Sequence, residues 1–452
     1  MFLRAVYYGL TDGLDNQDPA AAKEWVDERL SKIAKFAGHN IPLWVDFFHE
    51  AGISAEHLQS VKDLGLLPFS SKRTLLSRPL DERLGIPEPE CVKMSTSGTT
   101  GGPMPVYYSK SFFDYVAGLT RFRIRRMQGI PYLKKSVSIT YETSAQIAND
   151  PNHKSQAPRR GKALGILNPL IGPLYDSMTK RLYISQSIQD IKRGLIDFKP
   201  SRLFGSPAYL RMLADLVRVD RSLDLHIDSA ISIGEPLDEN NRKYIESILR
   251  CEVFDGYGTN ETGVIASECR CKSGLHIITD SIVVEVLRNG QPVGENEEGD
   301  VYVTTLLNKA MPLFRYDTGD RAILGGSNCK CGRRTRKLKS VEGRKVDYVS
   351  SRDGKMVSPR RIANALHSVQ APRCQLVETD IYQFVLRWFG EGKDVRKEVI
   401  ESLYRELGDV DISVSDEKPD ALRAKFRPVI SRMSVSADNR WTQPLNQIKK
   451  II

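Results

Sequence analysis

The chain has 452 residues, of which 40% are hydrophobic and 27% are charged. This length and composition are typical of a globular protein with two or more domains, and they exclude a disordered or fibrous chain. No run of about 18 apolar residues is present, so no membrane-spanning helix is predicted. Residues 1–9 lack the long apolar stretch of a signal peptide, and we therefore expect a cytoplasmic protein.

The formal net charge of +10 fits nucleic acid or an anionic small molecule such as ATP equally well. No nucleic-acid-binding signature accompanies the charge, so we expect no nucleic-acid partner. Arg121, Arg123, Arg125 and Arg126 fall within a predicted helix. We expect these four arginines to form a solvated face of that helix.

Apolar residues with helical spacing, such as Trp25, Leu30, Ile33 and Phe36, predict helices. The predicted helices span residues 20–37, 46–51, 112–127, 187–198, 207–219, 238–249, 359–369 and 394–408. Short apolar runs predict strands at 106–108, 137–140, 181–184, 202–205, 229–233, 251–254, 281–287, 299–306, 375–378, 382–389 and 411–414. The polar segment 149–161 is expected to be a mobile loop.

Strands alternate with helices from residue 137 to residue 254, which predicts βαβ units and a mainly parallel sheet. The predicted fold class is α/β: a large N-terminal domain with mainly parallel sheets and a β-rich part, followed by a small mobile α+β domain. The predicted boundaries are a large domain at 1–342, a hinge at 343–347 and a small domain at 348–452.

Hydroxyl residues and glycines crowd the segment from Met94 to Pro105. Glycine permits backbone angles that turn successive N–H groups inward, and hydroxyls add donors, so such a run can bind phosphate. No lysine follows the last glycines, so this is not the common strand–loop–helix nucleotide motif. The alternative is an ordinary surface loop.

Two consecutive strand ends carry further polar motifs. Gly234-Glu235-Pro236 follows the strand at 229–233, and the run from Tyr257 to Gly263 follows the strand at 251–254. Because ligands of parallel sheets bind beyond the carboxyl ends of the strands, these motifs are expected to meet at one site.

The seven cysteines include two Cys-x-Cys pairs, Cys269 with Cys271 and Cys329 with Cys331, and His276 lies near the first pair. Paired cysteines in a cytosolic chain favour metal binding over a disulfide, and zinc prefers four sulfur or nitrogen ligands. The alternative is two unrelated pairs of thiols in turns. The remaining cysteines, Cys91, Cys251 and Cys374, are expected to be small buried hydrophobes.

Taken in order, these motifs resemble those of the adenylate-forming enzymes, in particular the phenylacetate–CoA ligase group and its capsule- and phenazine-biosynthesis relatives. The motifs that carry the resemblance are Ser-Thr-Ser-Gly-Thr-Thr-Gly at 95–101, Gly-Glu-Pro at 234–236, Tyr-Gly-x-x-Glu at 257–261, Arg-Tyr-x-Thr-Gly-Asp at 315–320 and Gly-Arg at 343–344. The resemblance covers nearly the whole chain, and it also includes residues 38–42 and 63–72.

The resemblance implies that a small, aromatic carboxylic acid attacks ATP to give an acyl adenylate, and that the thiol of CoA then displaces AMP. Its implied residues for binding ATP or AMP are Ser95, Thr96, Ser97, Gly98, Thr99, Thr100, Gly101, Gly234, Glu235, Pro236, Tyr257, Gly258, Thr259 and Asp320. Tyr257 is expected to stack on adenine, and Asp320 to accept the ribose hydroxyls. The implied catalytic residues are Lys425, Glu261 and Arg344, with Glu261 also binding Mg²⁺.

The resemblance also implies a structural zinc within residues 269–331, with ligands Cys269, His276, Cys329 and Cys331 and with Cys271 as an extra or alternative ligand. Three departures from the family pattern leave the second step open. Gly102 replaces the usual loop lysine, Val346 replaces the usual hinge residue, and Ala424-Lys425 replaces Gly-Lys. The acceptor could therefore be CoA, a carrier protein, an amine or a hydroxyl, or catalysis could be impaired; the oligomeric state stays open, with a dimer as one alternative.

Overall fold

The computed structural model describes most of the chain. The described residues are 19–95, 104–115, 120–131, 134–140, 178–184, 186–220, 222–369, 373–389, 394–417 and 427–431. The predicted loop at 149–161 and most of the glycine-rich segment lie outside these residues. Among the described residues, no helix is both long and apolar enough to cross a membrane.

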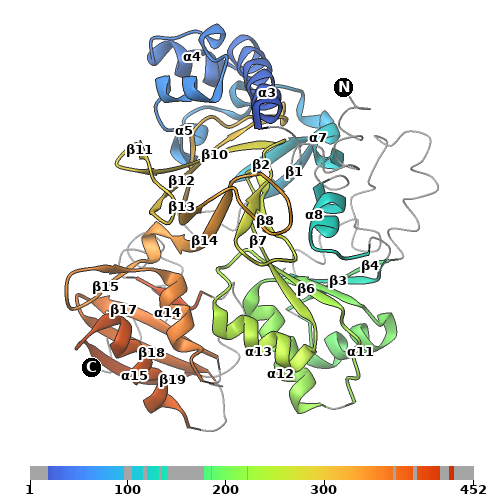
Figure 1. Ribbon diagram of the computed structural model, residues 1–452, viewed down its shortest axis with the longest axis vertical. Coiled ribbons are helices and arrows are strands. Elements are labelled where there is room, and N and C mark those ends of the chain that lie inside the picture. The colour runs from blue at the N-terminus through green and yellow to red at the C-terminus, as the bar shows by residue number, and fades with distance from the viewer. Residues whose placement is uncertain are drawn as a thin grey trace.

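A twelve-stranded sheet with the strand order β11-β10-β12-β13-β14-β9-β8-β7-β6-β5-β3-β4 runs through the molecule (Figure 1). One half is parallel and consists of β3 (Ser136–Thr140), β4 (Thr179–Tyr183), β5 (Arg202–Gly205), β6 (Ser229–Ile233) and β7 (Glu252–Thr259). The other half is antiparallel and consists of β8 (Gly263–Glu268), β9 (Leu275–Ile277), β10 (Ile282–Arg288), β11 (Gln291–Pro292), β12 (Glu298–Thr305), β13 (Tyr316–Gly325) and β14 (Lys337–Arg344). The predicted α/β class is confirmed.

The parallel half is covered by α11 (Ile188–Phe198), α12 (Pro207–Val219) and α13 (Glu239–Leu249). Local sequence sets their ends. The side chains of Ser187 and Asp238 accept hydrogen bonds from the third backbone N–H of α11 and α13, and both helices end at a residue in the left-handed conformation. Their apolar faces form one core with the strands, and this core includes Leu195, Leu213 and Ile245.

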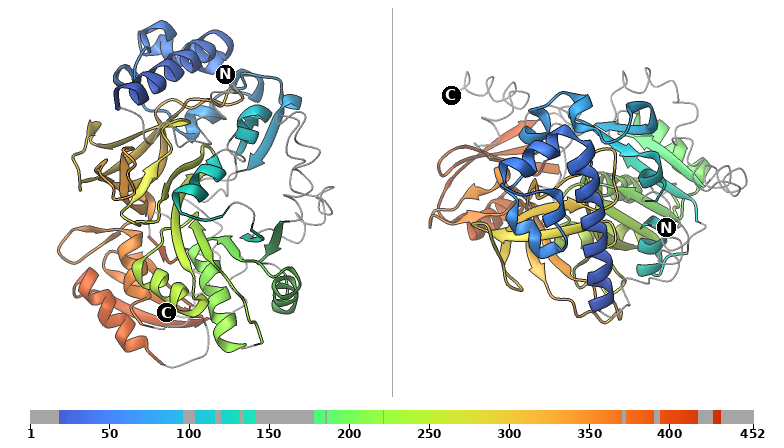
Figure 2. Two further views of the ribbon diagram at one scale, coloured as in Figure 1. Left: turned by 45° about the vertical axis from the view of Figure 1, so that its right-hand side comes forward. Right: turned by 90° about the horizontal axis from the view of Figure 1, so that it is seen from above.

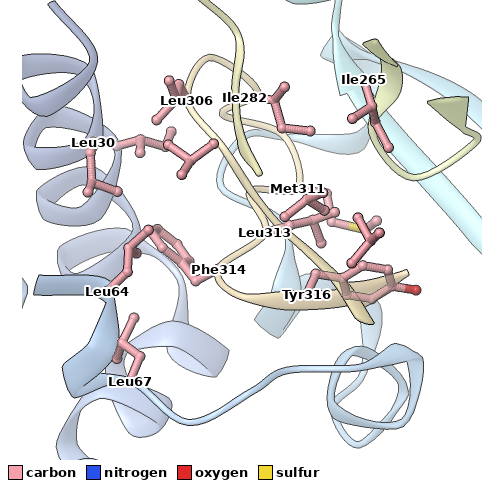
Figure 3. Close-up of a cluster of buried hydrophobic side chains, with 14 of the residues drawn as sticks. Leu30, Leu64, Leu67, Ile265, Ile282, Leu306, Met311, Leu313, Phe314 and Tyr316 are labelled. Carbon is pink, nitrogen blue, oxygen red and sulfur yellow. The ribbon is translucent and has the colours of Figure 1, made fainter. Parts of the chain in front are cut away.

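The N-terminal region is helical and consists of α3 (Pro19–Asn40), α4 (Pro42–Glu50), α5 (Lys72–Leu76), α6 (Leu80–Arg83) and the short 3-10 helices Ala55–His57, Val61–Leu66 and Glu88–Glu90. The α4 helix begins at Pro42 instead of residue 46, because proline suits the first turn of a helix. Figure 3 shows Leu30, Leu64 and Phe314 in the shared core that joins these helices to the antiparallel half of the sheet.

The glycine-rich segment connects two paired strands. β1 (Cys91–Ser95) and β2 (Pro105–Ser109) form an antiparallel ladder that ends with the Ser95–Pro105 pair. The predicted helix at 112–127 is described in two parts, α7 (Lys110–Tyr115) and α8 (Arg121–Met127), and residues 116–119 between them lie outside the described residues.

The prediction that these arginines form a solvated helix face is wrong for Arg123. The Nη1 atom of Arg123 lies 2.8 Å from Oδ1 of Asp280, and both side chains are buried. A buried charge needs such a partner, and a helical charge pattern alone does not show that the partner lies more than a hundred residues away. Cys251 and Cys374 are buried as predicted, whereas Cys91 is only half-buried.

Residues after β14 form a separate four-stranded sheet with the order β19-β18-β17-β20. Its elements are β17 (Arg373–Asp380), β18 (Gln383–Phe389), α15 (Arg396–Leu407), β19 (Asp411–Glu417) and β20 (Val429–Ile430), preceded by the hairpin β15 (Val349–Ser350) and β16 (Met356–Val357) and by α14 (Pro359–Leu366). This unit has its own core and lies beside α13 (Figures 1 and 2). The elements match the predicted α+β composition; the domain boundaries stay a prediction.

Candidate active site

A cavity of about 480 Å³ lies between the large sheet and the four-stranded unit. Its wall includes the ends of β6, β7 and β14, the start of β13 and the first residues of α5. The structure brings the following residues predicted from the sequence to this wall: Gly234, Glu235, Pro236, Tyr257, Gly258, Thr259, Glu261, Asp320 and Arg344.

Strand topology explains this convergence. β6 and β7 are parallel neighbours, so their carboxyl ends reach the same edge of the sheet. Just before the turn at 260–262, β7 and β8 approach closely at Gly258, where an added Cβ atom would lie 2.5 Å from the carbonyl oxygen of Gly263. A side chain at 258 would therefore open the turn that carries Glu261.

Asp320 lies at the centre of a buried hydrogen-bonded group. The Tyr257 hydroxyl donates to Oδ2 of Asp320 at 2.9 Å, and Nε of Arg344 lies 3.1 Å from Oδ1. Asp320 and Arg344 are direct cross-strand partners on β13 and β14. The nearby Asp320 carboxylate raises the pKa of Arg344, and burial, followed by Asp320, raises the pKa of Tyr257. A carboxylate has about four lone-pair sites, so Asp320 can accept further hydrogen bonds from the cavity side.

The first prediction concerns the replacement of Asp320 by alanine. ATP binding should weaken by roughly 1.5–3 kcal/mol, the range for hydrogen bonds to a charged group. Titration calorimetry measures the change, and Asp300→Ala is a matched control because Asp300 pairs with Lys345 and lies outside the cavity wall. An unchanged affinity for ATP in Asp320→Ala would contradict the assignment of the ribose site.

Glu261 occupies the turn between β7 and β8, and its carboxylate accepts a hydrogen bond from the Tyr316 hydroxyl. Burial and the Glu261 charge raise the pKa of Tyr316, so this phenol stays a donor. Magnesium commonly binds one or two carboxylates together with substrate phosphates and water. A half-buried carboxylate that faces an open cavity fits that requirement.

The glycine-rich segment can be placed only through its ends. Ser95 is the last residue of β1, and Thr96, Ser97, Gly98, Thr99, Thr100 and Gly101 lie outside the described residues. On β2, the Tyr108 hydroxyl donates to the carbonyl of Asn260. The hairpin that carries the segment therefore adjoins the turn that carries Glu261.

Two parts of the cavity wall were missed by sequence reasoning. Lys72 and Arg73 line the cavity. They are held there because the preceding Ser70 forms a β-bridge with Tyr316, in which the backbone N–H of Ser70 donates to the carbonyl of Arg315. Both cations suit an anionic ligand. Their signal was a Ser-Ser-Lys run within the segment that carried the family resemblance.

The other missed residue is Asp255, which lies on β7 two residues before Tyr257. Burial, together with the neighbouring Glu268, raises the pKa of the Asp255 carboxyl to about 8, although Arg242 opposes the shift. Arg242 is already paired with both oxygens of Glu268, at 3.0 and 2.9 Å. Asp255 can therefore keep its proton near neutral pH and offer a hydrogen-bond donor at the cavity wall.

Lys425 lies outside the described residues. The nearest described residue after it is Arg427, which forms a buried ion pair with Asp347, and Arg427, Pro428 and Val429 line the cavity. The hydroxyl of Ser431 donates to the carbonyl of Val346. The chain next to Lys425 is thus attached to residues 346–347, within the predicted hinge.

A second cluster lies at the far ends of β8 and β14. One ligand atom from each of Cys269, His276, Cys329 and Cys331 lies within 4.8 Å of all the others. Nδ1 of His276 lies 2.9 Å from Thr335 Oγ1, which leaves Nε2 facing Cys331 Sγ at 3.5 Å. Cys271 lies outside this group, and its backbone N–H donates to Cys269 Sγ. Three sulfurs and one imidazole nitrogen are a ligand set that suits tetrahedral zinc.

No protein-family model matches the chain. Curated relatives do match: the chain is 26% identical over 415 residues to phenylacetate-coenzyme A ligase of Thermus thermophilus, with 88% of this chain and 87% of the relative covered. It is 27% identical over 364 residues to the Pseudomonas putida protein of the same name, with 78% of this chain and 77% of the relative covered.

Solved structures are similar over the whole molecule. A 2-hydroxyisobutyryl-CoA ligase in its postadenylation state, in complex with 2-HIB-AMP, aligns with a TM-score of 0.75 at 20% identity and covers 97% of this chain and 94% of that chain. The chain therefore has the fold of the adenylate-forming CoA ligases. In sequence it is a homologue of the phenylacetate–coenzyme A ligases, which confirms the predicted resemblance.

Proposed function

We propose that this protein is an AMP-forming acid–CoA ligase that activates a small, aromatic carboxylic acid with Mg²⁺ and ATP. The observation that carries the proposal is the meeting of four motifs, spread over residues 234–344, around one cavity. The similarity to phenylacetate-coenzyme A ligases over most of the chain supports the acid class and the acceptor.

In the first step, an oxygen of the substrate carboxylate attacks the α-phosphorus of ATP, and the bond from that phosphorus to the bridging oxygen of pyrophosphate breaks. Phosphoryl transfer of this kind depends on positioning and on neutralising charge. We assign Asp320 to the ribose hydroxyls, Arg344 to the adjacent sugar and phosphate, and residues 95–101 to the β and γ phosphates. Gly234, Glu235, Pro236, Gly258 and Thr259 would line the adenine, with Tyr257 stacking on it.

Glu261 would hold Mg²⁺, which, when bound, neutralises charge on the phosphates. The chain's own contribution is to fix Glu261 at the edge of the cavity through Tyr316 and through the close approach of β7 and β8 at Gly258. In the second step, the sulfur of CoA attacks the acyl carbon, and the bond from that carbon to the adenylate oxygen breaks to release AMP. We place this chemistry in the cytoplasm because it consumes ATP and CoA.

Two further assignments extend the proposal. Residues 1–342 form the large domain, 343–347 the hinge and 348–452 a mobile lid that carries Lys425. A carrier-protein thiol, an amine or a hydroxyl remains the alternative acceptor, because Gly102 stands in place of the loop lysine of many relatives.

The test is ATP–pyrophosphate exchange over a panel of aromatic and aliphatic carboxylic acids. Exchange with an aromatic acid, followed by thioester formation on addition of CoA, is the expected result. Exchange without thioester formation would indicate that the acceptor is a carrier-protein thiol, an amine or a hydroxyl instead of CoA. No exchange with any acid would overturn the adenylation proposal.

The second prediction concerns zinc at the four-ligand cluster. Purified protein should contain about one zinc per chain, because a closed site with four protein ligands is structural. Cys331→Ser should lose the metal and lower the melting temperature, since metal binding stabilises the ends of β8 and β14. Metal analysis and thermal unfolding measure both effects.

Cys271→Ser is the matched control, because Cys271 adjoins the cluster without belonging to it. This variant should keep zinc and its melting temperature. Loss of zinc from Cys271→Ser but not from Cys331→Ser would assign Cys271 as the ligand instead, and metal-free protein of unchanged stability would contradict the site altogether.

A further inference from the structure

The four-stranded unit contacts the large sheet's helices through the apolar side chain of Phe389 and through a group of polar side chains. The first turn of α13 faces the last turn of α14, and the two helices lie side by side in Figure 1. Nδ2 of Asn240 donates to the carbonyl of Asn364 at 2.9 Å, and Arg360 lies 3.5 Å from Glu239. These contacts join segments on opposite sides of the predicted hinge.

The most buried of these contacts is an aspartate–histidine pair. Nδ1 of His367, just after α14, lies 3.0 Å from Oδ2 of Asp238, just before α13, and the two side chains are 8% and 1% exposed. The second oxygen of Asp238 accepts the backbone N–H of Asn241, so one carboxylate both caps α13 and binds the other unit. Burial alone would raise the pKa of Asp238, but the His367 imidazole holds it below its usual value.

This pair is adjacent to the candidate active site. A small gap beside the pair is lined by the charged residues Arg211, Glu235, Asp238 and Arg373, together with His367. Glu235, Pro236 and Pro428 line both this gap and the large cavity. The guanidinium of Arg373 donates to the carbonyl of Ala208 at 3.1 Å, which adds another bond between the units. Val429 pairs with Leu376 in the same four-stranded unit, so a contact that holds this unit in place also keeps residues 427–429 at the cavity.

We propose that Asp238 and His367 are positioning residues that hold the four-stranded unit in the arrangement required for adenylate formation. This inference rests on the proposed function, because it assumes that adenylate formation takes place at the candidate active site. A buried bond that exists in one arrangement of two units stabilises that arrangement relative to every other one. Because both partners are desolvated, removing one of them leaves the other buried without its charge-assisted hydrogen bond.

The test compares the two half-reactions in His367→Ala. ATP–pyrophosphate exchange should fall by about ten-fold to a hundred-fold, the range for loss of one hydrogen bond to a charged group. Thioester formation from a supplied acyl adenylate should be unchanged or faster, since that step does not require this arrangement. His367→Asn places an amide near the position of Nδ1 and should restore most of the exchange.

Arg361→Ala is the matched control. Arg361 lies on the same helix but pairs with Glu406 inside the four-stranded unit, so its loss should leave the ratio of the two half-reactions unchanged. A purely structural role of His367 would lower both half-reactions of His367→Ala equally, and that result would overturn the proposal.

A second readout does not depend on catalysis. Asn240 and Asn364 can both be replaced by cysteine, and oxidation then joins the units with a disulfide that is detected by peptide mass spectrometry. In a His367→Ala background the crosslink should form about ten-fold more slowly, because its rate follows the fraction of docked molecules. An unchanged rate would overturn the positioning role. A slower crosslinking rate would support the positioning role even if the protein showed no ATP–pyrophosphate exchange with any acid. The absence of exchange would overturn only the proposed function.

Discussion

Replacing Glu261 by glutamine is expected to lower ATP–pyrophosphate exchange by about a hundred-fold to a thousand-fold, the range for loss of one preorganised electrostatic group. Glutamine keeps the size of the side chain and its hydrogen bond to Tyr316, but it removes the negative charge that a hard cation requires. The fold should be intact, because the turn depends on Gly258 and not on the charge at 261.

Glu252→Gln is the control for this experiment. Glu252 begins the same strand, β7, at the end away from the cavity, and its side chain is exposed. Exchange should be measured in both variants across a range of Mg²⁺ concentrations. Full activity of Glu261→Gln at every concentration would contradict the metal role of Glu261.

The strands of the parallel half were predictable because each is a short, locally encoded apolar run. Residues 202–205 and 229–233 and the helix at 207–219 match the structure at both ends. β7 was predicted too short, because Asp255 and the glycines after it are weak strand formers in isolation. The backbone bonds of β7 to β6 and β8 override that local preference.

The continuation of the large sheet from β9 into β14 was not predictable. It depends on the pairing of β9 with β14, whose partners Leu275 and Leu338 are distant in sequence, and no local pattern reports such a register. The buried pair of Arg123 with Asp280 and the contact of Asp238 with His367 were missed for the same reason.

The candidate site was more predictable than the fold because its chemistry lies in short motifs. The motifs that carry the family resemblance pointed to residues between 234 and 344 that line the cavity, and the four residues that the resemblance implied as zinc ligands lie close together. Asp255 was not identified, since its raised pKa arises from burial beside Glu268, a tertiary effect that sequence does not display.

The position of the small unit gives Lys425 a specific expected role. The chain two residues beyond it lines the cavity and is held by the ion pair of Arg427 with Asp347. We expect this unit to close over the cavity and to bring Lys425 to the α-phosphate of ATP in the closed arrangement. A compact cation on a flexible stem suits the charge that develops there.

Lys425→Ala should therefore slow adenylate formation by about a hundred-fold to a thousand-fold, the range for loss of one group that stabilises transition-state charge. Turnover of a supplied acyl adenylate should be nearly unchanged, because we expect thiol attack to need no cation at 425 and to follow rotation of the unit about a hinge near Val346 and Asp347. Single-turnover measurements of each half-reaction test the division, with Lys397→Ala, an exposed lysine on α15, as the control. Equal losses in both half-reactions would contradict the division of roles. No loss in either would transfer the catalytic role to another lysine, and Lys449 and Lys450 would be tested next.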